Sequence, residues 1–104
     1  MNTLAIEMLP AATSLCVTED SLVLDLEDGR TISVPLAWYP RLMHGTVKER
    51  NNWRLIGRGQ GIHWPDLDED ISVENILLGK SSGENQRTLK EWLEKREGQL
   101  VPDA

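Results

Sequence analysis

The stretch of sequence that decides the fold is LVLDLEDGRTISVPL, which occupies residues 22–36. Apolar residues alternate with other residues on both sides of a central Asp28-Gly29 pair: Leu22, Leu24, Leu26, Ile32, Val34 and Leu36. Alternation over two such short runs predicts strands with one buried face. Asp-Gly between the runs favours a tight turn, because Gly29 adopts a positive φ without a Cβ clash. Residues 22–36 therefore predict a β-hairpin.

A third strand is predicted just upstream, over residues 12–18. Leu15 and Val17 lie two residues apart there, and Glu19-Asp20 provides a turn into the hairpin. The three runs together predict a three-stranded antiparallel meander. Cys16 then points away from Leu15 and Val17. Because no basic or histidine neighbour in the local sequence would activate its thiol, we interpret Cys16 as a structural residue.

The rest of the chain predicts short helices, one or two further short strands and a C-terminal helix. Residues 53–56 and 62–64 have strand composition and flank three closely spaced glycines. Four helix starts are predicted by a proline or by capping residues: Pro40, Thr46 with Glu49, Ser72, and Ser81 with Glu84. Gly45 and Gly79 each predict the end of a helix. With the meander, these elements predict an α+β fold.

Length and composition limit the organisation of the chain. The 104 residues predict one α+β domain over residues 1–79, followed by a polar linker and a helix over residues 80–104. No run of 18 apolar residues is present and residues 1–10 lack a basic region, so neither a membrane span nor a secretory signal is predicted. The lone Cys16 excludes an internal disulfide framework. We expect a cytoplasmic protein.

Charge is distributed in blocks along the chain, whose formal net charge is −6. Residues 38–61 carry five basic side chains and one acidic one, whereas residues 66–74 carry five acidic side chains and no basic one. An internal explanation is that Arg41 and Arg58 pair with acids of residues 66–70 and tie the blocks together. A functional explanation is that one block binds a partner.

Catalysis and metal binding find little support. His63 lies close in sequence to four carboxylates, those of Asp66, Asp68, Glu69 and Asp70. Their spacing matches no EF-hand or other metal signature. There is no nucleophile elbow, P-loop or dinucleotide fingerprint. We therefore expect a protein that is not an enzyme and that holds no cofactor or metal.

Nucleic-acid binding is an alternative that rests on the basic block. Arg50, Arg54 and Arg58 would contact phosphates there, and Trp53 would offer a stacking surface. The net charge of −6 opposes this interpretation, because phosphate binding needs a positive field.

One segment resembles a known family. Residues 61–73 read GIHWPDLDEDISV and are followed by Leu77-Leu78-Gly79. This string resembles the bacterial family called domain of unknown function 2442, and the likeness extends over residues 12–79. The resemblance implies a small α+β domain without an assigned activity. It also implies a place in short operons beside another small protein with toxin-like features.

These observations together favour a binding module. We expect an antitoxin-like partner of a small basic protein, or a homo-oligomer, in which an acidic segment engages cationic residues and an amphipathic helix lies in an apolar groove. The four tryptophans supply much of the core volume, and Trp92 is the one expected on a recognition surface. The predicted partner-binding residues are Asp66, Asp68, Glu69, Asp70, Leu89, Trp92 and Leu93.

Overall fold

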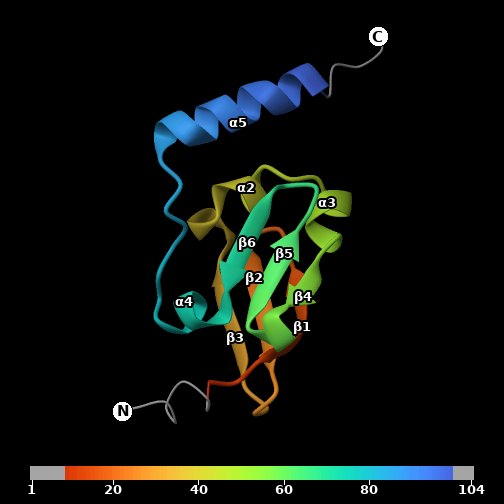
Figure 1. Ribbon diagram of the computed structural model, residues 1–104, viewed down its shortest axis with the longest axis vertical. Coiled ribbons are helices and arrows are strands. Elements are labelled where there is room, and N and C mark those ends of the chain that lie inside the picture. Colours follow the sequence, from red (N-terminus) through yellow and green to blue (C-terminus); the bar gives the residue numbers. More distant parts are fainter. Residues whose placement is uncertain (1–8, 100–104) are drawn as a thin grey trace.

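The first sheet is the predicted meander. The computed structural model describes residues 9–99. β1 (Ala12–Val17), β2 (Ser21–Leu26) and β3 (Thr31–Pro35) form an antiparallel sheet in the order β1-β2-β3 (Figure 1). Gly29 adopts a φ of +95° in the turn between β2 and β3. The hairpin over residues 22–36 and the third strand upstream of it are therefore confirmed.

Side chains alternate across this sheet as the sequence predicts. Leu22, Leu24 and Leu26 of β2 are buried on one face, together with Leu15 of β1. Cys16 is a free cysteine that is exposed on the opposite face of β1. A shift of the register by one residue would turn every buried leucine to solvent, so burial of this face fixes the strand pairing.

A series of short helices follows the meander. The 3₁₀ helix η1 (Leu36–Trp38) leads into α2 (Pro40–Met43) and α3 (Val47–Asn51). The predicted capping box is present at the start of α3. The Glu49 backbone N–H donates to the Thr46 hydroxyl at 3.1 Å, and the Thr46 N–H donates to the Glu49 carboxylate at 2.9 Å. These two bonds satisfy donors that the first turn of a helix otherwise leaves unpaired.

The second sheet has three strands, where the sequence predicted one or two. β4 (Arg54–Ile56), β5 (Gly61–Trp64) and β6 (Glu69–Ser72) are antiparallel in the order β4-β5-β6. The 3₁₀ helix η2 (Gly57–Gly59) connects β4 to β5. Gly59 has a φ of +84°, and a Cβ there would lie 2.7 Å from the Ala12 carbonyl oxygen. Only glycine therefore lets η2 approach the start of β1 so closely.

The predicted acidic loop is in part a strand. Residues 66–68 turn the chain, but Glu69 and Asp70 already pair with Trp64 and His63 of β5. Ile71 is buried in β6. The sequence did not predict this strand, because its first residues are acidic and Ile71 is the one apolar residue on its buried face.

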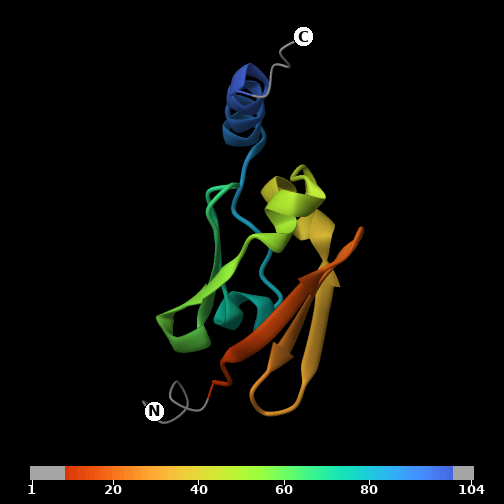
Figure 2. The same ribbon diagram turned by 90° about the vertical axis from the view of Figure 1, so that its right-hand side faces the viewer.

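The core lies between the two sheets, which face each other as two layers (Figure 2). Its fully buried large side chains come from both sheets and from the connections between them: Leu22, Leu24, Leu36, Leu42, Ile62, Trp64, Leu67 and Val73. The Trp64 indole N–H donates to the Arg50 carbonyl oxygen at 3.0 Å, so the buried ring leaves no unpaired donor. Trp38 and Trp53 are partly buried against this core, in agreement with their predicted structural role.

Two helices complete the chain. Ser72 caps α4 (Val73–Leu77) by accepting from the Asn75 N–H at 3.0 Å, as predicted. The last helix, α5 (Gln86–Gln99), begins later than the Ser81 cap predicted. Asn85 caps it, because its side chain accepts from the Thr88 N–H at 2.8 Å. α5 lies across the end of the molecule that carries α2 and the turn between β5 and β6 (Figure 1).

No helix within residues 9–99 combines the length and the apolar character that crossing a bilayer requires. The signal-peptide prediction concerns residues 1–10, most of which lie outside the described residues.

Candidate functional site

The acidic turn between β5 and β6 projects its carboxylates in different directions. Asp68 occupies the left-handed region with a φ of +51°, and its side chain is 89% exposed. Asp66 is also exposed, and its carboxylate accepts from the Asn52 side-chain amide at 2.9 Å. Asp70 lies on the outer face of β6, where it contacts the His63 ring across the strand pair. The turn therefore presents three exposed carboxylates.

Glu69 lies on the other face of the same strand. Because strand residues alternate, Glu69 shares the inward side of β6 with Ile71, and its side chain is half-buried. Burial raises the pKa of Glu69 to about 7, although the nearby Arg41 acts in the opposite direction and Glu84 adds to the rise. Glu69 is thus separated from Asp66, Asp68 and Asp70, with which the sequence grouped it.

This division removes the basis for a metal site. Among the residues that the structure describes, no three histidine, cysteine, aspartate or glutamate side chains are grouped so that they could hold a metal ion. His63 meets Asp70 alone of the four nearby carboxylates.

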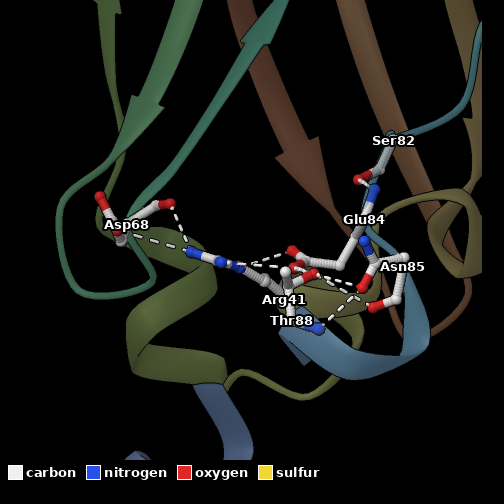
Figure 3. A network of polar contacts seen from close by, with 6 residues as sticks. All are labelled: Arg41, Asp68, Ser82, Glu84, Asn85 and Thr88. Atoms are coloured by element: carbon white, nitrogen blue, oxygen red, sulfur yellow. Dashed lines mark hydrogen bonds and ion pairs between the residues drawn. The ribbon is translucent and has the colours of Figure 1, made fainter. Parts of the chain in front are cut away.

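Arg41 connects the acidic turn to the start of α5 (Figure 3). Its guanidinium donates to Glu84 at 2.7 Å and to the Asp68 carbonyl oxygen at 3.0 Å, and lies 3.5 Å from the Asp68 carboxylate. The predicted pairing of Arg41 with the acidic segment is therefore confirmed. Arg58, by contrast, is exposed in η2 and forms no ion pair with any other residue of the range 9–99.

Glu84 is the most enclosed carboxylate of this network, with only 8% of its side chain exposed. Burial raises its pKa, but the hydrogen bond from the Thr88 hydroxyl at 2.6 Å and the pairing with Arg41 outweigh burial, so the pKa of Glu84 lies below its usual value. Glu84 therefore stays ionised and holds the first turn of α5 against α2.

A second ion pair and a tryptophan fix the middle of α5. Arg96 donates two hydrogen bonds to Glu49, at 2.9 and 3.0 Å, and its hydrogen bonding holds the pKa of Glu49 below the usual range. Trp92 lies between two guanidinium groups, with ring centroid distances of 5.2 Å to Arg41 and 4.8 Å to Arg96. Trp92 also packs against the core. It therefore helps to hold α5 on its own domain, and its place on a recognition surface stays a prediction.

A groove runs along another face of α5. Its volume is about 620 Å³, and every described residue that lines it belongs to this helix, including Leu89, Lys90, Leu93 and Glu97. Leu89 and Leu93 are only half-buried and, unlike Trp92, do not pack against the buried core. One residue along an α-helix corresponds to a rotation of about 100°, so Leu93 lies about 100° around the helix from Trp92, with Leu89 between them.

The basic block of residues 41–58 does not form one free surface. The Arg50 guanidinium donates to the carbonyl oxygens of Leu42 at 2.8 Å and Met43 at 2.6 Å, which are at the end of α2. Trp53 packs against the core. Of the residues predicted to bind nucleic acid, only Arg54 and Arg58 are exposed.

A family model described as "Protein of unknown function (DUF2442)" matches residues 12–82. The chain belongs to the DUF2442 family. The sequence-based assignment over residues 12–79 is therefore confirmed. Within this DUF2442 chain, the acidic turn, Arg41 and Glu49 lie inside the matched region, whereas α5 lies beyond it. Among curated proteins, none matches the chain.

Two solved structures share the DUF2442 chain's fold. A crystal structure of a protein of unknown function from Rhodospirillum rubrum is 23% identical, with a TM-score of 0.64, and the match covers 78% of this chain and 98% of that one. A solution NMR structure of an uncharacterised protein from Chromobacterium violaceum is 19% identical, with a TM-score of 0.63, and the match covers 85% of this chain and 80% of that one. These likenesses show the α+β fold alone.

Sequence reasoning missed the residues that hold α5. Glu84 lies 43 residues from Arg41, and Arg96 lies 47 residues from Glu49. No local spacing connects such distant residues. The sequence offered one indication of these contacts. Residues 38–61 carry more basic than acidic side chains, which favours ion pairs with acidic residues elsewhere in the chain.

Proposed function

We propose that this DUF2442 chain is a non-enzymatic binding module for a basic protein partner. The observation that carries the proposal is the face of α5 formed by Leu89 and Leu93, which do not pack against the buried core of residues 9–99. Arg41 links the first turn of α5 to Asp68, so this apolar face and the exposed carboxylates lie at the same end of the molecule. An apolar strip beside acidic groups suits an amphipathic basic helix.

The contacts that anchor α5 support this function. The two ion pairs with Glu84 and Glu49, and the Trp92 ring between two guanidinium groups, fix the helix before any partner arrives. A preorganised surface loses less conformational entropy on binding than a flexible one. Leu89 and Leu93 would supply the buried apolar contact.

Asp66, Asp68 and Asp70 would steer a cationic partner towards this face. A small basic protein has this chemistry, so an antitoxin-like role is part of the proposal. We place it in the cytoplasm, where an exposed lone cysteine such as Cys16 remains reduced.

A pair of synthetic peptides tests the proposal. One is an amphipathic helix with leucine on one face and lysine on the other, and its control carries glutamate in place of lysine. Fluorescence anisotropy should detect binding of the lysine peptide alone. Leu93→Ser should weaken that binding by roughly tenfold, because one apolar anchor is lost. Leu78→Ser is the matched control, since Leu78 directly follows α4, is 60% exposed and lies outside the groove.

Three results would contradict the proposal. Equal binding of both peptides would exclude recognition of charge, and unchanged binding by Leu93→Ser would exclude the α5 face. A dimer in sedimentation equilibrium that Leu93→Ser dissociates would assign the groove to a second copy of the chain. Tight, salt-dependent binding of a labelled duplex, lost on Arg54→Gln with Arg58→Gln, would instead support the nucleic-acid alternative.

A further inference from the structure

A second cavity lies on a different side of the domain from the α5 groove. It is enclosed by Tyr39, by β6, by the start of α4 and by the linker at residues 80–83, and its volume is about 190 Å³. The linker is fixed in place, because the Tyr39 hydroxyl donates to the Lys80 carbonyl oxygen at 3.4 Å and the Ser82 N–H donates to the Trp38 carbonyl oxygen at 3.0 Å. The cavity is therefore a defined part of the fold.

Polar residues make up most of the wall of this cavity, and they include the cationic Lys80 as well as groups that carry oxygen acceptors. Glu69 contributes a carboxylate, and Ser72, Ser81 and Ser82 contribute hydroxyl groups. The hydroxyls of Ser72 and Ser82 each accept one backbone N–H and keep a second lone pair. Such a wall offers many acceptors to a ligand that brings its own donors.

Glu69 is the carboxylate in this wall that lacks a side-chain partner among the described residues, although the Asp70 backbone N–H donates to it. Among residues 9–99, no side chain donates a hydrogen bond to its carboxylate and no cationic group lies within ion-pair distance. The nearest guanidinium, that of Arg41, is directed to Glu84 and Asp68. A half-buried carboxylate without a counter-ion is unfavourable, so a cation that entered the cavity would be stabilised there.

We propose that this cavity binds the alkylammonium group of a small primary amine, with Glu69 as its counter-ion. An ammonium group carries three donors and no acceptor, which complements the oxygen acceptors of the wall. The cavity is smaller than the roughly 300–1,000 Å³ typical of drug-sized ligands, so the amine is small. This site differs from the proposed apolar face, because its lining includes no residue of α5, although Asp70 belongs both to the lining and to the carboxylates proposed to steer a partner.

The ionisation of Glu69 should make amine binding depend on pH. Burial raises the pKa of Glu69 to about 7, and Glu84 and Asp70 raise it while Arg41 lowers it. The amine binds the ionised carboxylate, so its affinity should increase as the pH rises from 6 to 8. Two neighbouring groups keep their charge in this interval, because burial raises the pKa of Tyr39, and the hydrogen bonds of Glu84 with Thr88 and Arg41 outweigh burial and lower the pKa of Glu84. Lys80 also lines the cavity.

An NMR titration of the full chain with n-butylamine tests the site. At pH 8 the amide signals of residues 69–72 and 80–83 should shift and saturate, and uncharged n-butanol should leave them unchanged. Glu69→Gln should weaken binding by roughly tenfold or more, because it removes the counter-ion. Glu74→Gln is the matched control, since it removes an exposed carboxylate on α4, outside the cavity lining.

Three results would contradict the proposed amine site. The same titration in Glu69→Gln, whose own spectrum reports its folding, would overturn the proposal if n-butylamine still saturated these signals. So would equal affinity of the unaltered chain at pH 5.5 and pH 8, a test that needs no substitution. Shifts as large at Asp66 and Asp68 as at residues 69–72 would show general attraction to acidic groups and would also overturn it.

Discussion

Replacing Glu69 with glutamine should change how the stability of the protein depends on pH. Burial raises the pKa of Glu69 from an ordinary value of 4.5 to about 7 in the folded chain. Folding therefore favours the protonated side chain. The stabilisation is fully present below pH 4.5 and is lost as the pH rises through about 7. Glutamine mimics the protonated form at every pH, so Glu69→Gln should lack this loss.

The magnitude follows from the two pKa values. A rise from 4.5 to about 7 corresponds to about 3 kcal/mol. Glu69 is only half-buried, and solvent screens its charge, so we expect a change of about 1–2 kcal/mol. Between pH 5 and pH 8, the free energy of unfolding of the unaltered chain should fall by this amount relative to that of Glu69→Gln.

Urea denaturation monitored by tryptophan fluorescence measures this difference, since Trp64 is fully buried. The ionised Glu49 and Glu84 have lowered pKa values, so their contributions are common to both proteins above pH 5 and cancel. Glu74→Gln, on the exposed side of α4, should track the unaltered chain. A difference between the unaltered chain and Glu69→Gln that stays constant from pH 5 to pH 8 would refute the reasoning.

Three further substitutions test the fold. Thr46→Ala should cost about 1 kcal/mol in urea denaturation, because the first turn of α3 loses its capping acceptor, and no loss would exclude the capping box. Arg96→Gln should speed amide hydrogen exchange in α5 at pH 7 by releasing Glu49, and unchanged exchange would show that this ion pair does not hold the helix. Gly59→Ala should lower the unfolding free energy by about 2 kcal/mol or more, because its Cβ would meet a carbonyl oxygen of β1 at 2.7 Å. Gly29→Ala has the same positive φ but open space around it, so it should cost less, and equal costs would contradict the clash.

Local patterns predicted the parts of the fold whose causes are local. The alternation around Asp28-Gly29 fixed the hairpin, because the period of two and the turn residues act within a few positions of each other. The caps at Thr46 and Ser72 were predicted for the same reason. β6 was missed because its buried face is marked by Ile71 alone and its first residues are acidic.

The candidate site could be predicted only in part. Charge blocks indicated that Arg41 pairs with the acidic segment, and Asp68 is that partner. The position of Trp92 could not be inferred from its helix alone, because its ring also contacts Arg41 of α2 and the buried core. The inward direction of Glu69 depends on the register of β6, which the sequence did not reveal.

The four carboxylates of residues 66–70 have different roles, and the partners of each carboxylate determine its role. Asp68 shares Arg41 with Glu84, so part of its charge serves the docking of α5, while its exposed side chain still faces solvent. Among residues 9–99, Asp66 has an amide and Asp70 a histidine ring as its side-chain partner, which leaves their charge available for steering a cation. Exposed charges of this kind affect the rate of association more than the lifetime of a complex. The lifetime must then depend on an apolar contact, and the structure provides one beside them on α5. An acidic turn without that helix face would attract basic proteins without retaining them.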